Sequence, residues 1–281
     1  MVRTEPPNPE WTPRSSGQHV PSFLGQPGPS AYHRLNPLTK LVFATVIAVA
    51  AVILGGVAGP VVLLILTVGL PAASAGVLSR LLRTSLLLSL PIGISALLVN
   101  LFFFPGGRDV LFQVGPITAT QEGLAFALEI LARILAISGA ITLFYLTTPP
   151  NELVTDLERR GVSPRLAFVA SSSIQTVPAM VERASTIVAA QRARGFDTEG
   201  GFIRRLRGLV PIVGPVIMGS IAEVEERSMA LEARGFTRPG RRTLLWAPAD
   251  PPAQRLARWL LVLALVALIA ARFSGVLGPL P

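Results

Sequence analysis

Two arginines in this sequence stand in the same setting and offer the same chemistry. Arg194 lies in Ala193-Arg194-Gly195-Phe196, and Arg234 lies in Ala233-Arg234-Gly235-Phe236, forty residues further on. A guanidinium is permanently charged, and its planar fork of N–H donors suits a carboxylate. The alanine before each arginine leaves little side chain beside it, so a partner can approach closely. The alternative is that both arginines only compensate the dipoles of two ordinary capped helices.

A second candidate is a charge pair inside an apolar run. Glu129 and Arg133 lie four residues apart, which is one turn of a helix. Charged residues within a membrane segment are costly, and an intramembrane pair is therefore a functional candidate. The alternative is a self-neutralising pair that faces the interior of a helix bundle.

The remaining residues exclude most catalytic chemistry. The chain has no cysteine, and both of its histidines, His19 and His33, lie near the N-terminus. We therefore expect no thiolate nucleophile, no histidine-based triad and no metal site in the membrane. Lys40 is the only lysine and is not part of a G-x-x-x-x-G-K-[ST] sequence, so the chain has no P-loop. The sequence predicts neither an enzyme nor a bound cofactor.

The composition is that of a membrane protein. The mean hydropathy is +0.57 and charged residues make up 15% of the 281 positions, below the roughly 25% of soluble domains. The net charge of +9 comes almost entirely from arginine. In a membrane protein such a charge is typical of basic cytoplasmic loops and not of nucleic-acid binding.

Apolar runs divide the chain into segments. We predict an all-α membrane protein with about five transmembrane helices and a domain of two long amphipathic helices. The second run is short for a bilayer, and the first two runs could instead form one re-entrant hairpin, but we predict two spans. A short strand or hairpin could form in the loop that follows the third span. The predicted spans cover residues 38–54, 61–77, 85–104, 123–146 and 256–273.

Loop charges predict the orientation and the domain boundaries. Arginines gather on the N-terminal side, in a small loop with Arg80 and Arg83, and in a long insert before the last span. The positive-inside rule then places the N-terminus and the insert in the cytoplasm, with the C-terminus outside. The predicted parts are a disordered tail (1–34), four spans (35–148), the insert (149–250), and the last span with the C-terminus (251–281).

The insert must position the two arginines. A short amphipathic helix over 151–160 should stop at Gly161, and Ser163-Pro164 should begin the first long helix, kinked at Pro178. The second long helix should run over 202–234 and break near its prolines. Each helix carries a matching stripe, shifted by forty residues. The two stripes are Val177, Val181, Ala184, Val188 and Gln191, and Ile217, Ile221, Val224, Ser228 and Leu231.

Both long helices end on signals for a left-handed cap. Gly195 and Gly235 suit the C′ position with a positive φ. Phe196 and Phe236 then follow at C″, where each could fold back onto its own helix, at Ala190 or Leu231. At the start of the first span, Asn36 suits an N-cap before a proline at the first helical position.

These residues resemble the transmembrane T-component of energy-coupling factor (ECF) transporters, the CbiQ-like family. That family carries two Ala-Arg-Gly motifs at the ends of two cytoplasmic coupling helices, here 193–195 and 233–235. Segments 148–153, 161–165 and 190–192 match the surroundings of those motifs, and 35–41 resembles the N-terminal signature, with Asn36 where Asp is usual. The resemblance covers residues 35–273.

The resemblance implies a transporter subunit of a prokaryotic cell membrane. Its partners would be two cytoplasmic ABC-type ATPases and a membrane-embedded S-component that binds a vitamin or a transition-metal ion. Arg194 and Arg234 would each dock in a groove of one ATPase, against acidic side chains. ATP hydrolysis would belong to the partners, which agrees with the missing P-loop.

Other functions remain open at this stage. A stand-alone channel or secondary carrier would use Glu129 and Arg133 in its pathway and would need no ATPase. An intramembrane enzyme would need a second carboxylate, which no neighbouring position supplies. The permease of a different importer would carry one coupling helix. The polar run Ser171-Ser172-Ser173 with Gln175 could touch a substrate or only form a solvated or helix-packing face.

Overall fold

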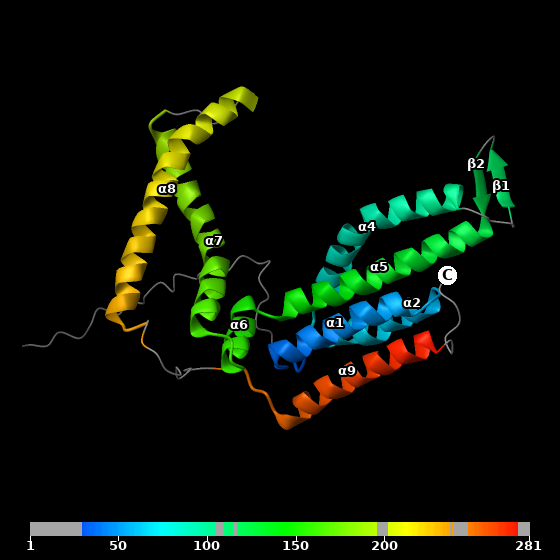
Figure 1. The fold of residues 1–281 in the computed structure, drawn as a ribbon. Coiled ribbons are helices and arrows are strands. Elements are labelled where there is room, and N and C mark those ends of the chain that lie inside the picture. Colours follow the sequence, from blue (N-terminus) through cyan, green and yellow to red (C-terminus); the bar gives the residue numbers. More distant parts are fainter. Residues whose placement is uncertain are drawn as a thin grey trace, which may run out of the picture. The chain divides into compact units, whose positions relative to one another are not determined.

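A computed structural model of the protein describes residues 30–104, 110–114, 117–195, 202–236, 238 and 247–274. The chain forms two compact units, which we name the membrane unit (1–156 with 248–281) and the insert unit (157–247). Most of the predicted N-terminal tail and Phe196 lie outside the described residues. The elements, most of which are labelled in Figure 1, are α1 (Pro37–Ile53), α2 (Ala58–Leu63), a π-helix η1 (Leu64–Gly69), α3 (Leu70–Ser74), α4 (Leu78–Phe103), β1 (Val110–Val114), β2 (Ile117–Thr120), α5 (Gln121–Thr147), α6 (Pro150–Arg159), α7 (Pro164–Ala193), α8 (Phe202–Ala233) and α9 (Pro252–Phe273).

The prediction of an all-α membrane protein is confirmed. Three helices of the described chain, α4, α5 and α9, are long and apolar enough to cross a membrane. The segments Pro37–Ile53 and Ala58–Ser74 are also apolar but no longer than 17 residues, so the number of five spans remains a prediction. Among the described residues the only strands are β1 and β2, which form an antiparallel pair before α5.

Two predicted breaks are wrong, because helices continue through them. Arg80 and Arg83 belong to the first turns of α4 and not to a loop. α8 is continuous from residue 202 to residue 233, although a break near its prolines is predicted. α7 is one helix from Pro164 to Ala193 with Pro178 inside it, and the kink at that proline stays a prediction. A proline costs a helix about 3 kcal/mol locally, and the long helix on either side, packed against a neighbour, outweighs that cost.

Small side chains bring the membrane helices together. Ala51, Ala127 and Ala136 are fully buried. A Cβ added at Gly139 of α5 would come within 3.0 Å of Leu64 Cδ1, so the glycine lets η1 pack closely against α5. Ser89 and Ser138 also share a 2.7 Å hydrogen bond between α4 and α5. Close approach through small residues is the usual basis of helix packing in membranes.

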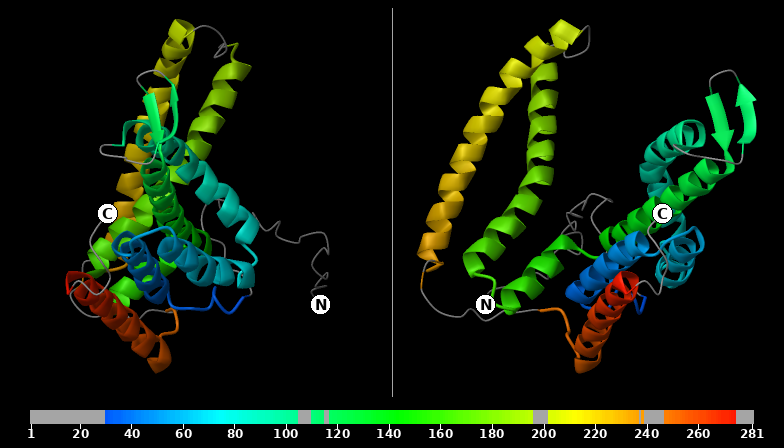
Figure 2. Two further views of the ribbon diagram at one scale, coloured as in Figure 1. Left: turned by 90° about the vertical axis from the view of Figure 1, so that its right-hand side faces the viewer. Right: turned by 45° about the vertical axis from the view of Figure 1, so that its right-hand side comes forward.

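The insert unit is built on two antiparallel helices. α8 runs back along α7, as both views of Figure 2 show. Phe168 near the start of α7 meets Phe236 just after α8, and Arg183 in the middle of α7 pairs with Glu223 of α8. Consequently the C-terminal ends of the two helices lie at opposite ends of this pair.

Candidate functional site

The two arginine motifs form similar helix ends. Gly195 and Gly235 have φ angles of 81° and 66°, as the left-handed cap requires. The amide of Gly195 donates to the carbonyl of Arg192, and the amide of Gly235 donates to that of Glu232, both at 2.9 Å. After α8 the amide of Phe236 also donates to Leu231 O at 2.9 Å, which completes a Schellman motif.

Both arginines are available to a partner. Arg194 is the C-cap residue of α7, Arg234 is the residue directly after α8, and both are exposed. A helix of 32 residues is about 48 Å long, so the antiparallel arrangement keeps the two guanidinium groups far apart. The unit therefore presents two separate cationic ends and not one basic cluster.

The ring of Phe236 contacts the other helix of the pair, α7. Its centroid lies 4.9 Å from that of Phe168, with an edge-to-face angle of 60°. The backbone of Phe236 folds back onto Leu231, as the sequence predicts, but the ring reaches the first turns of α7. This contact fixes the end of α8, and with it Arg234, to the start of α7.

A charge cluster holds the middle of the two helices. Glu223 of α8 accepts hydrogen bonds from Arg183 of α7 and from Arg227 of its own helix, the second at 2.8 Å. Arg183 also donates to Ser220 Oγ at 3.4 Å. The hydrogen bond and the charge of Arg183 lower the pKa of the Glu223 carboxyl. The cluster joins α7 to α8 halfway between the two arginine ends.

An apolar face remains exposed on the insert unit. Val177 and Val181 of the first stripe are 63% and 65% exposed, and Ile217 and Val224 of the second are 51% and 68% exposed. A groove of about 520 Å³ lies between the helices, and Ser172 and Thr176 are among its lining residues. Exposed apolar surface of this extent is typical of protein or membrane contacts.

The side chains of Arg133 and Glu129 are in direct contact. The two side chains form an ion pair along one turn of α5, and Glu129 is 6% exposed. Its carboxylate also accepts from the amide of Gly56 at 2.9 Å, in the turn between α1 and α2. The guanidinium of Arg272, near the end of α9, lies beside Gly55. The pair therefore fastens the turn after α1 to α5.

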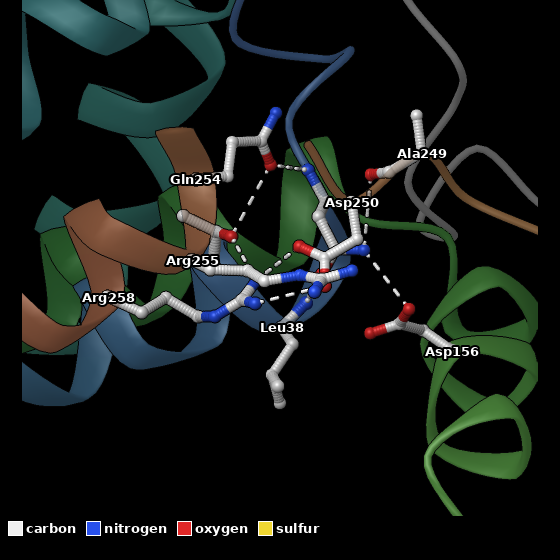
Figure 3. Close-up of polar contacts among 9 residues, drawn as sticks. Leu38, Asp156, Ala249, Asp250, Gln254, Arg255 and Arg258 are labelled. Atoms are coloured by element: carbon white, nitrogen blue, oxygen red, sulfur yellow. Dashed lines mark hydrogen bonds and ion pairs between the residues drawn. The ribbon is translucent and has the colours of Figure 1, made fainter. Parts of the chain in front are cut away.

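A buried polar cluster that the sequence did not predict surrounds the first turn of α1, and we name it the hub (Figure 3). Asn36 caps α1 by accepting from Leu38 N at 3.0 Å, as predicted. Its amide group also donates to Asp156 Oδ1 of α6 at 3.1 Å and to Ala249 O at 3.3 Å. Gln254 of α9 accepts from the backbone amide of Asn36 at 2.8 Å.

Two further residues of α1 extend the hub. Thr39 Oγ1 accepts from Arg258 at 2.8 Å, and Arg258 forms an ion pair with Asp250 at 2.9 Å. Lys40 Nζ donates to His33 O at 2.9 Å and to Thr147 O, at the end of α5, at 2.8 Å. The first turn of α1 thus joins the end of α5, the helix α6 and the start of α9.

Comparison with known proteins decides the family. Residues 28–245 match the CbiQ family, described as cobalt transport protein. The chain belongs to the CbiQ family. The energy-coupling factor transporter transmembrane protein EcfT of Bacillus selenitireducens is 31% identical over 272 residues, which cover 90% of this chain and 98% of that protein. The EcfT proteins of Brevibacillus brevis and Thermosediminibacter oceani are 31% and 30% identical, over 82% and 76% of this chain and 89% and 83% of their own lengths.

The CbiQ-family match includes both arginine motifs and the hub residues Asn36 and Asp156. This chain is therefore the transmembrane component of an energy-coupling factor transporter, and a membrane protein. As a CbiQ-family member it is a transporter subunit and not itself an enzyme.

Proposed function

We propose that this chain couples two cytoplasmic ABC-type ATPases to a membrane-embedded S-component and so drives uptake of a vitamin or a transition-metal ion. Arg194 and Arg234 are the docking residues, one for each ATPase, and Ala193, Gly195, Ala233 and Gly235 shape the two ends. When the ATPases move on binding ATP, they pull on the ends of α7 and α8.

One observation carries this proposal. The same exposed arginine, followed by a glycine of positive φ, stands at each end of one antiparallel helix pair. Two similar, well-separated cationic ends suit two similar partners better than one. The guanidinium fork can bind a carboxylate through two parallel hydrogen bonds, which fixes direction as well as position.

The other parts of the chain take supporting roles in this proposal. The exposed apolar stripes of α7 and α8 contact the S-component or the membrane surface. The insert over 149–250 is the cytoplasmic coupling domain, and the N-terminus lies on the same side. The Glu129–Arg133 pair is a tie within the bundle, since the Gly56 amide and the Arg133 guanidinium both engage the carboxylate.

Co-purification with the ATPases tests the docking residues. Replacing both arginines in one chain (Arg194→Glu with Arg234→Glu) should release the ATPases, because each docking carboxylate then meets another carboxylate. The membrane unit should remain folded, because neither residue belongs to it. If both ATPases remain bound at the level of the unaltered protein, the proposal is wrong.

A matched control separates docking from general charge. Arg165 and Arg192 are also exposed arginines of α7, but neither stands before a capping glycine. The double variant Arg165→Glu with Arg192→Glu makes the same change in net charge. It should keep the ATPases, whereas equal loss in both double variants would show that only the overall positive charge of the unit matters.

A further inference from the structure

The hub contains one bond that reaches the helix leading to the coupling domain. α6 is a continuous helix from Pro150 to Arg159, and the boundary between the two compact units follows Asp156 within it. Asp156 is fully buried, and its Oδ1 accepts from Asn36 Nδ2 at 3.1 Å. The chain itself joins the insert unit to the membrane unit at two places, within α6 and at the segment before α9.

Asn36 links both of these connections to α1. The same amide nitrogen donates to Asp156 on α6 and to Ala249 O, just before α9. Meanwhile Oδ1 of the side chain caps α1, and the backbone amide holds Gln254. A residue with both a donor and an acceptor on a short side chain is needed for this arrangement.

We propose that the Asn36–Asp156 hydrogen bond is a latch that makes α6 move as one body with the starts of α1 and α9. The latch rests on the proposed coupling function and names the residues through which movement of the coupling domain enters the membrane helices. Asn36 and Asp156 act as positioning residues, because neither contacts the ATPases in this account. Thr39 and Arg258 support the latch by holding α9 against the same turn of α1.

The chemistry of the pair offers a substitution that opens the latch without removing the helix cap. Aspartate caps a helix as well as asparagine does, so Asn36→Asp retains the bond from the Leu38 amide. It removes the donor, however, and sets two carboxylates at the distance of a hydrogen bond, where both cannot ionise without strong repulsion. In the double variant Asn36→Asp with Asp156→Asn, the amide stands on α6 and the bond forms again in the opposite direction.

Pulsed electron paramagnetic resonance can measure the movement of α6. The chain has no cysteine of its own, so spin labels attach only at introduced sites, Arg159→Cys at the end of α6 and Leu256→Cys on α9. Both positions are exposed. The measurement uses the full chain in nanodiscs with its ATPases bound, with and without ATP. Asn151→Asp makes the same chemical change at an exposed site of α6 and serves as the matched control.

If the latch is closed, the distances between the labels at positions 159 and 256 should form a narrow distribution. ATP should not change this distribution in the unaltered protein or in Asn151→Asp. Asn36→Asp should broaden the distribution and make it respond to ATP, and the double variant should narrow it again. An Asn36→Asp distribution as narrow as that of the unaltered protein would overturn the proposal. So would a double variant that stays broad, or an unaltered protein whose distance changes with ATP.

The same samples distinguish failure of the latch from failure of the proposed function. Arg194 and Arg234 are intact in every variant, so all of them should retain the ATPases. Loss of the latch pattern with the ATPases still bound contradicts the latch alone. If no ATPase binds even to the unaltered chain, the coupling function fails, and the label distances without nucleotide still report whether Asn36 holds α6.

Discussion

Phe236, directly after the second arginine motif, packs edge-to-face on Phe168 at the start of α7, with ring centroids 4.9 Å apart. The two residues are far apart in sequence, yet their contact determines where α8 ends in space. Arg234 stands two residues before Phe236, so the direction of its side chain depends on this ring pair. The end of α8 is thus held by a tertiary contact as well as by its own glycine cap.

Removing one ring of this pair should loosen the end of α8. An aromatic pair contributes about 0.5–1.5 kcal/mol beyond the area it buries. In Phe168→Ala, the amide of Phe236, which donates to Leu231 O, should exchange its hydrogen about fivefold faster, as a loss of about 1 kcal/mol implies. Hydrogen exchange read by mass spectrometry measures this.

The other arginine end is the internal control for that experiment. The amide of Gly195 lies at the opposite end of α7 and donates to Arg192 O. Its exchange should not change in Phe168→Ala. Equal acceleration at both ends would mean that the substitution unfolds the whole unit and that the ring contact has no local effect.

The glycine of each arginine motif should tolerate no side chain. An alanine in the left-handed conformation costs about 1–2 kcal/mol, and φ is 66° at Gly235. Gly235→Ala should therefore unwind the end of α8, misdirect Arg234 and weaken ATPase binding. The retained fraction of ATPase in a co-purification measures the effect.

The same substitution inside α8 should have the opposite effect on the helix. A Cβ added at Gly214 would have no atom within 4 Å, apart from the neighbouring residues and the helix's own nearby backbone. Alanine is favoured over glycine in a helix by about 0.5–1 kcal/mol. Gly214→Ala should leave ATPase binding intact and slow hydrogen exchange in α8. If Gly235→Ala binds ATPase as well as Gly214→Ala does, the conformation of the motif is unimportant.

The Glu223 cluster should make the α7–α8 pair sensitive to acid. The pKa of Glu223 in the folded unit lies below its ordinary value of 4.5, chiefly because Arg183 donates a hydrogen bond to it. Between the folded pKa and 4.5 the folded unit therefore binds fewer protons than the unfolded chain. The stabilisation that the Glu223 ion pair gives the folded unit is complete above pH 4.5 and is lost as the pH falls through the lower, folded pKa. Hydrogen exchange of α7 and α8, compared at neutral and acid pH, should show this loosening.

Neutral substitutions test the assignment of that acid response. Glu223→Gln should loosen the pair at neutral pH and reduce its further loosening in acid. Glu226 is an exposed residue of the same helix, so Glu226→Gln is the matched control and should behave like the unaltered protein. If Glu223→Gln loosens in acid as much as the unaltered protein does, a group other than Glu223 causes the acid response.

The only lysine gives a chemical probe of the hub. Lys40 is 1% exposed, and two backbone carbonyls, His33 O and Thr147 O, hold its ammonium group. An amine-reactive ester should acylate Lys40 slowly in the folded protein and rapidly once a denaturing detergent unfolds it. Mass spectrometry of the peptide that contains Lys40 measures both rates, and rapid acylation in the folded protein would contradict this burial.

Local signals in the sequence were sufficient to predict the ends of several helices. The cap by Asn36, the start of α7 at Ser163-Pro164 and the positive φ of both motif glycines depend on residues within a few positions of one another. The predicted break near the prolines of α8 failed because the packing of a long helix against its neighbour overrides a local preference. Periodicity also placed the matching stripes on α7 and α8, but it gave no information about which residues meet between those helices.

The hub could not be predicted because its partners are distant in sequence. Asn36 meets Asp156 at a separation of 120 positions and Gln254 at a separation of 218. Asp250, Arg255 and Arg258 could have given a signal, since charged residues at the start of an apolar run need partners. That signal would have indicated a polar cluster without identifying α1 as its centre.

Site-specific photo-cross-linking tests the central claim most directly. Ala193 and Ala233 are exposed and stand directly before the two arginines, so a photoreactive amino acid at either position leaves both guanidinium groups intact. The account predicts that each position cross-links to an ATPase subunit, and that a chain with both probes captures two of them. Cross-links at either position only to lipid or to another membrane protein, with the complex intact, would contradict it.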